Sequence, residues 1–71
     1  MKTINIVVAE ESVKFKDDIR NFMVSSVDYD LGDPVGVGAT EQDAIEDYKE
    51  MWMLTYGEEI DVNTSSRIIR H

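Results

Sequence analysis

Apolar residues alternate with polar ones over the first ten positions, as they do on a β-strand that buries one face. In KTINIVVAE, Ile4, Ile6 and Val8 fall on one side of such a strand. IRNFMVSSVDYD alternates in the same way, with Phe22 and Val24 on a common face. The pattern therefore predicts two strands, each with a buried and an open side.

The segment between and after these strands contains weaker signals. VKFK, residues 13–16, has two apolar positions in alternation, and whether it forms a separate strand is left open. DYDLGDP is typical of a loop, because aspartate and glycine tolerate turn geometry and Pro34 restricts the residue before it. PVGVGA then predicts a strand with glycines on one face. Glycines in a strand indicate that another element, here a helix, lies close against that face.

A phosphate-binding loop is the alternative interpretation of these glycines. A Walker loop needs lysine followed by serine or threonine after its last glycine, but Ala39 and Thr40 follow Gly38. A dinucleotide fingerprint needs a third glycine where Glu41 stands, and the carboxylates that follow would repel a phosphate. Close strand–helix packing is therefore the preferred interpretation.

A helix is predicted from about residue 41 to 55. Thr40 is a favourable N-cap with Asp43 three residues later, and Gly57 is a natural stop. EEIDV and SSRIIR follow as two short strand-like pieces, one of which we expect to return to the sheet. The apolar stripe of the helix comprises Ala44, Ile45, Tyr48, Met51, Trp52 and Thr55, and we expect Met51 and Trp52 to reach the core.

The resulting order, β-β-β-α-β, predicts an α+β fold with an antiparallel sheet of three to five strands and one packed helix. Residues 1–71 are expected to form one domain, because this length is too short for two cores. A domain of this size retains only a few kcal/mol of net stability, and the sequence has no cysteine to add disulfides. We therefore expect a homodimer.

Charge is distributed unevenly along the chain. The net charge is −8, and the segment from Asp28 to Asp61 contains Lys49 as its single basic residue. The last ten residues carry Arg67 and Arg70 and no acid. Such a chain repels nucleic acid and anionic membranes over most of its surface and attracts a basic partner.

Candidate chemistry is sparse. With no cysteine and with His71 as the one histidine, we expect no metal site, no cofactor site and no catalytic triad. Pairs of acids such as Glu46 and Asp47 are sequence neighbours that point apart on a helix, so they do not predict acid–base catalysis. The carboxylates of DYDLGD lack the glycine and glutamate of an EF-hand. We expect a protein that is not an enzyme.

No apolar run approaches the 18–20 residues that span a bilayer, and MKTINIVVAEE lacks a cleavage site, so the sequence favours a cytoplasmic protein without a membrane partner. Met51, Trp52, Met53 and Leu54 cannot all face one core, because successive helix positions are about 100° apart. Met53 or Leu54 is expected to face a partner, such as a second copy. On the open side of the second strand, Met23 or Val27 is expected to do likewise. The predicted partner-binding residues are Glu46, Asp47, Glu50, Met53 and Leu54.

GATEQDAIEDYKEMW resembles the strand-to-helix junction of HicB-type antitoxin domains. The matching positions are Gly38, Thr40, Asp43, Ala44 and Ile45, and RNFMVSSVDYDLGDP is similar to the second strand of that family and the turn after it. The resemblance covers about residues 20–55. It implies a HicB-like fold and a domain that binds and blocks a small RNA-cleaving toxin. The DNA-binding element that often follows in that family has no room in the sixteen or so residues after the helix, so repressor activity is not expected.

The charge and the exposed helix residues predict a small, acidic, non-enzymatic protein that binds a basic protein, and the resemblance implies an inhibitor of phage or prophage type whose partner is a toxin or a host defence protein. One alternative is a nucleic-acid mimic, because the acids from Glu41 to Glu50 are spaced about 3 Å apart along the helix, close to the ~3.4 Å of phosphates in one DNA strand. A direct nucleic-acid binder that uses Arg67 and Arg70, or a structural phage component, are the remaining alternatives.

Overall fold

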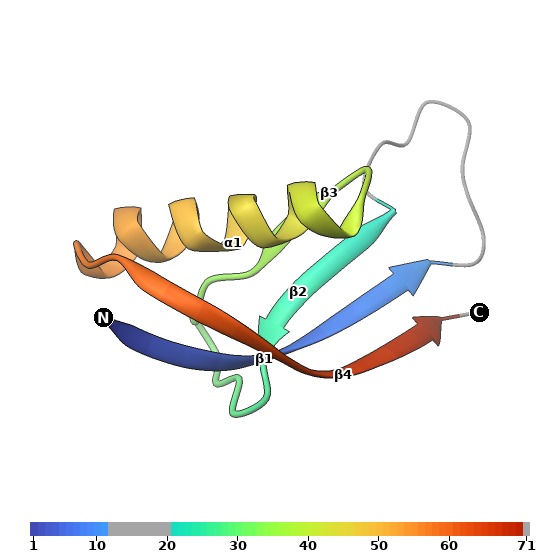
Figure 1. Ribbon diagram of the computed structural model, residues 1–71, viewed down its shortest axis with the longest axis horizontal. Coiled ribbons are helices and arrows are strands. Elements are labelled where there is room, and N and C mark those ends of the chain that lie inside the picture. The colour runs from blue at the N-terminus through green and yellow to red at the C-terminus, as the bar shows by residue number, and fades with distance from the viewer. Residues whose placement is uncertain (12–20, 71) are drawn as a thin grey trace.

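The chain folds into a four-stranded sheet with one helix packed on one of its faces (Figure 1). The computed structural model describes residues 1–11 and 21–70. The short strand considered at residues 13–16 lies outside the described residues, as does His71. The elements in chain order are β1 (Lys2–Glu11), β2 (Phe22–Ser26), β3 (Gly36–Gly38), α1 (Glu41–Tyr56) and β4 (Ile60–Arg70).

The predicted α+β fold with one packed helix is confirmed, but the sheet is mixed and not wholly antiparallel. Its strand order is β3-β2-β1-β4, in which β2 pairs antiparallel with both β1 and β3, whereas β4 pairs parallel with β1. The helix explains this parallel pair. It returns the chain from the end of β3 to the end of the sheet where β1 begins, so β4 must run beside β1 in the same direction (Figure 1).

One face of the sheet and one stripe of the helix form the core. Ile4, Ile6 and Val8 are buried, as their alternation predicted. Burying an aliphatic side chain of this size contributes about 1.5–3 kcal/mol, so this row is a main source of stability. The remaining members of the buried cluster are Val24, Ala44, Tyr48, Trp52 and Ile60.

The two glycines of β3 lie directly under the helix. A Cβ atom at Gly36 would stand 2.3 Å from the backbone oxygen of Ala44 and 2.5 Å from the backbone nitrogen of Tyr48. At Gly38 it would stand 2.6 Å from the Ala44 nitrogen. The interpretation of VGVGA as a site of close strand–helix packing is therefore confirmed.

The helix has the predicted caps and ends one residue later than predicted. The Thr40 hydroxyl accepts a hydrogen bond from the Asp43 N–H at 3.1 Å, and Gly57 adopts a left-handed conformation with φ 69°. The buried stripe is narrower than expected, because Met51 is 38% exposed and Thr55 is exposed. The expectation that Met51 reaches the core is wrong. With the helix backbone so close to β3, a single row of residues four apart occupies the space, namely Ala44, Tyr48 and Trp52.

The two strand-like pieces at the end of the chain are one strand. β4 pairs with β1 along its whole length, with a register shift where Thr64 pairs with Ile6 and Ser66 pairs with Val7. Ser65 is the extra residue of this β-bulge. The polar run NTSS looks like a break in the pattern, but a bulge inserts one residue without ending the pairing.

Tyr48 is fully buried, yet its hydroxyl has no hydrogen-bond partner among the described residues. Burial raises the pKa of this phenol, and the negative charge of Asp33 adds to the effect. An unpaired buried hydroxyl costs about 1–3 kcal/mol. The aromatic ring therefore stabilises the core while its hydroxyl opposes folding.

Replacing Tyr48 by phenylalanine is accordingly expected to leave the free energy of unfolding unchanged or to raise it by about 1 kcal/mol. Urea denaturation of the wild type and the variant measures this difference. The matched control is Tyr29→Phe, since Tyr29 is half exposed and should show no change. A loss of about 1 kcal/mol or more in the Tyr48 variant would contradict the expectation and indicate that a buried water pairs with the hydroxyl.

Candidate functional site

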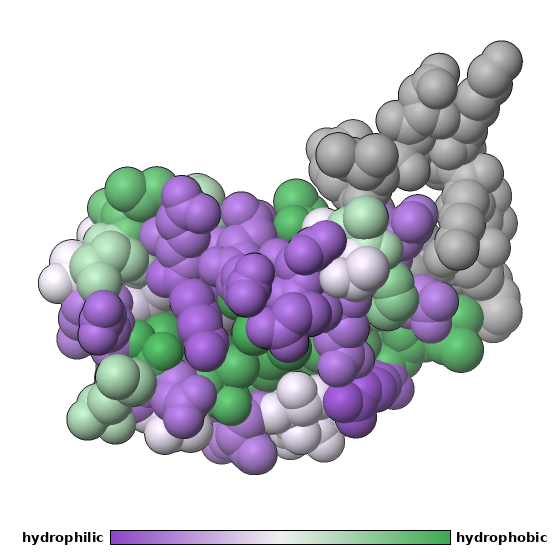
Figure 2. Space-filling view, turned by 45° about the horizontal axis from the view of Figure 1, so that its top comes forward, coloured by the Kyte–Doolittle hydropathy of each residue, from purple (hydrophilic) through white to green (hydrophobic). Residues whose placement is uncertain are grey.

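Four of the five predicted partner-binding residues share the outer face of α1. Glu46, Glu50, Met53 and Leu54 follow one another at helical spacing, on the side opposite the buried stripe, and all four are exposed. We call these four residues the outer stripe. Leu54 is the most exposed of them, at 72%. Figure 2 shows hydrophilic residues over much of the face that carries α1, with hydrophobic residues towards the end where the helix stops.

Asp47, the fifth predicted residue, is directed elsewhere. Its carboxylate accepts a hydrogen bond from the backbone N–H of Val37 at 2.9 Å, in a partly buried position. Val37 lies in the middle of β3, which is an edge strand of the sheet. Asp47 thus pairs an otherwise free edge N–H and joins the helix to β3.

Glu41 at the start of α1 is also occupied. The Arg67 guanidinium donates two hydrogen bonds to its carboxylate, at 2.8 and 3.1 Å. These bonds hold the pKa of Glu41 below its ordinary value and raise the pKa of Arg67. The pair links β4 to the first turn of the helix.

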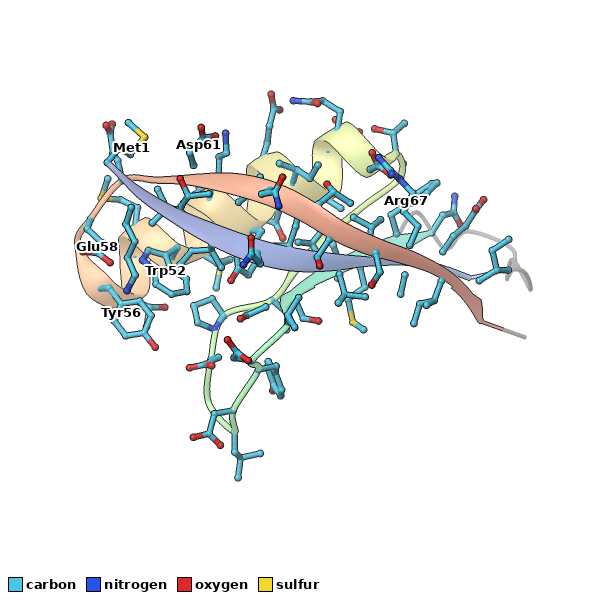
Figure 3. The ribbon with its side chains drawn as sticks, turned by 60° about the horizontal axis from the view of Figure 1, so that its bottom comes forward. Met1, Trp52, Tyr56, Glu58, Asp61 and Arg67 are labelled. Atoms are coloured by element: carbon cyan, nitrogen blue, oxygen red, sulfur yellow. The ribbon has the colours of Figure 1, made fainter. Side chains whose placement is uncertain are left out.

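An aromatic ladder closes the other end of the helix (Figure 3). The Trp52 ring lies 4.6 Å from the Tyr56 ring, and its Nε1 donates a hydrogen bond to Glu58 at 3.0 Å. The Tyr56 hydroxyl donates to the Asp33 carboxylate at 3.1 Å, which raises the pKa of Tyr56. The ammonium group of Lys2 lies 5.5 Å from the centre of the Trp52 ring. The spacing of four residues between these aromatics is the sequence signal that could have revealed the ladder.

A groove of about 450 Å³ runs between the second half of α1 and the start of β4. Glu50 and Met53 of the outer stripe line it, so the groove adjoins the predicted partner-binding residues. Lys49, also in its lining, lies 3.9 Å from the Asp61 carboxylate, and both side chains are substantially exposed. The other residues of the lining are Met1, Glu59 and Ile60.

The groove combines carboxylates with flexible apolar walls. Glu50, Glu59 and Asp61 contribute negative charge, and Met1 and Met53 contribute thioether side chains. An arginine or lysine side chain has a matching structure, with an apolar stem and a cationic head. Sequence reasoning missed Met1, Glu59 and Asp61 because they lie outside the helix and reach the groove only through the parallel β1–β4 pair.

The sheet face opposite the helix is a second exposed surface. A shallow hollow of about 380 Å³ lies on it, lined by Met23, Ser25, Tyr29 and Val35. Met23, one of the two residues expected on this side, is half-buried, whereas Val27 is exposed. The four residues that line this hollow are uncharged, in contrast to the outer stripe with its two glutamates.

No group of three or more histidine, cysteine, aspartate or glutamate side chains is arranged to hold a metal ion within residues 1–11 and 21–70. In the same part of the chain, no helix has both the length and the apolar character to cross a membrane.

Comparison of the chain with protein-family models, with curated proteins and with solved structures found no significant match. The resemblance to HicB-type domains therefore stays a prediction, and the functional proposal depends on the geometry of the outer stripe and the groove.

Proposed function

We propose that this protein is a small, acidic, cytoplasmic binding module without enzymatic activity, which inhibits a protein partner by occupying its basic surface. The observation that carries the proposal is the outer stripe and the groove beside it. There, Glu46 and Glu50 adjoin the exposed apolar residues Met53 and Leu54. Carboxylates of this kind steer a basic partner, and apolar residues next to them supply the buried contact.

The glutamate carboxylates of this surface are free to bind a partner. Glu50 and Glu59 form no hydrogen bond or ion pair with any described residue, and Glu46 accepts a single bond, from the Gln42 amide at 3.3 Å. The resemblance to HicB-type antitoxin domains supports an inhibitory role against a toxin or a host defence protein. It also supports the proposal that a phage or prophage encodes this protein.

A nucleic-acid mimic is less well supported. It would present the helix carboxylates as an evenly spaced row, but Glu41 is paired with Arg67 and Asp47 is bonded to the β3 edge. Arg67 is engaged in the ion pair with Glu41, and a protein that binds nucleic acid directly would need this arginine. Neither alternative is therefore proposed.

The proposal predicts that Glu50→Lys slows association with the partner about tenfold or more and flattens its salt dependence, because it places a like charge against a basic surface. The tagged wild type first captures the partner from host lysate at low salt and releases it at high salt. Association rates of the purified pair are then measured by surface plasmon resonance. Unchanged association kinetics for Glu50→Lys would overturn the assignment.

Matched control variants at exposed loop positions distinguish an effect of the outer stripe from a general effect of charge or of exposed apolar side chains. Asp28→Lys makes the same change of charge at an exposed loop position and should preserve the association rate. For the apolar part, Leu54→Ala is expected to accelerate dissociation, whereas Leu31→Ala should not, although Leu31 is even more exposed at 93%. If Asp28→Lys slowed association as much as Glu50→Lys, net charge and not the outer stripe would govern association. If Leu31→Ala accelerated dissociation as much as Leu54→Ala, the apolar contact would not be specific to the outer stripe.

A further inference from the structure

The outer edge of β4 is the longest free edge of the sheet. β4 spans Ile60–Arg70 and lies at the end of the strand order, so within the described residues only its β1 side is paired. Its sequence, IDVNTSSRIIR, contains neither the proline nor the lysine that commonly protects an edge strand. Ile68 and Ile69 are 49% and 61% exposed. This edge offers apolar side chains and backbone groups that pair with no second strand, although the Val62 N–H donates a hydrogen bond to the adjacent Asp61 carboxylate at 3.0 Å.

Because of the bulge, the residues that face the helix side of the sheet are placed in the same way in both halves of β4. Val62 and Thr64 pair with residues of β1 that face the helix side of the sheet. After the extra residue Ser65, Arg67 and Ile69 pair with helix-side positions again. The strand is therefore arranged symmetrically about its centre, with helix-side residues one and three positions before Ser65 and one and three positions after Ser66.

Two such strands can pair antiparallel with matching faces. Directly opposite residues in an antiparallel pair must lie on the same side of the sheet. A two-fold axis between Ser65 and Ser66 places Val62 of one copy opposite Ile69 of the other and satisfies this condition along the strand. The small serine side chains at the axis allow close approach, and the Val62–Ile69 pairs bury apolar surface on either side of it.

Charge favours the same arrangement. The start of β4 and the residues before it are acidic, with Glu58, Glu59 and Asp61, whereas its second half contains Arg67 and Arg70 and no acid. Antiparallel pairing brings opposite ends together and sets Asp61 opposite position 70. Parallel pairing would set like charges side by side, which is destabilising.

We propose that two copies of this chain associate through antiparallel pairing of their β4 edges, which gives a sheet that is continuous through both copies, with both helices on the same face. This assembly uses none of the four residues of the outer stripe, but it shares Asp61 with the lining of the adjoining groove. It leaves both outer stripes exposed, so the dimer presents two acidic surfaces. It also differs from the sequence-based expectation that Met53, Leu54, Met23 or Val27 mediates dimerisation.

Ile69→Lys tests the proposal. Because a two-fold assembly contains the substitution twice, the dimer dissociation constant should rise about tenfold or more. Sedimentation equilibrium over a dilution series measures this constant, and thermal unfolding followed by circular dichroism checks that the variant is folded. Leu54→Lys and Val35→Lys, at exposed positions on the helix and on the open sheet face, are matched controls that should preserve the dimer.

A charge exchange tests the register. Asp61→Arg and Arg70→Asp should each weaken the dimer, and the double variant should restore it, because each position meets the other across the axis. A wild-type protein that is monomeric at its highest soluble concentration would overturn the proposal. A dimer disrupted by Leu54→Lys or Val35→Lys but not by Ile69→Lys would also overturn it.

Discussion

Replacing Gly36 by alanine is expected to destabilise the folded protein by about 3 kcal/mol or more, or to prevent folding. The added Cβ atom would stand 2.3 Å from the Ala44 backbone oxygen and 2.5 Å from the Tyr48 backbone nitrogen. Backbone atoms of a helix cannot move aside as the end of a flexible side chain can. The helix would have to lift from β3, which would expose Tyr48 and reduce the contact of the whole buried stripe.

The expected loss of stability at Gly36 is the opposite of the usual effect of replacing glycine by alanine. Where the backbone tolerates it, alanine in place of glycine stabilises a protein by about 0.4–1 kcal/mol, because it restricts the unfolded chain. Gly57→Ala is the control: φ is 69°, but no atom lies within 4 Å of the added Cβ, so a loss of about 1–2 kcal/mol is expected from backbone strain alone. Urea denaturation compares the two variants. A Gly36 variant as stable as the wild type would contradict the close packing of α1 on β3.

The packing under the helix could be predicted because its signals are local. Alternation placed Ile4, Ile6 and Val8 on one face, and the caps at Thr40 and Gly57 fixed the helix within one residue. These features depend on neighbours two to four positions apart, which the sequence displays directly. The predicted outer stripe followed from the same helical periodicity.

Features that depend on distant segments could not be predicted in this way. The continuity of β4 through its bulge requires the pairing with β1, and the pattern of NTSS alone indicates a break. Met51 lies on the predicted apolar stripe, but the short distance between helix and sheet leaves it 38% exposed. Of the groove, the sequence identified Glu50 and Met53 but not the residues that β1 and β4 contribute.

Asp47 shows most clearly why a candidate site needs the structure. In the sequence it is one acid among several on an acidic helix, and it was predicted to bind a partner. In the fold it accepts the Val37 N–H at 2.9 Å, while its neighbour Glu46 points outward and is exposed. The two carboxylates differ by one helix position, or about 100°, and this rotation separates a structural role from a surface role.

Asp47→Ala is therefore expected to lower the free energy of unfolding by about 2 kcal/mol, because a hydrogen bond to a charged group is lost and the N–H of Val37 is left unpaired at a partly buried edge. Asp47→Asn retains a carbonyl acceptor and should lose less, and Glu46→Ala should change stability by no more than about 0.5 kcal/mol. Urea denaturation ranks the three variants. If Asp47→Ala proved as stable as Glu46→Ala, the Asp47 carboxylate would be dispensable for the fold and free to bind a partner, as the sequence predicted.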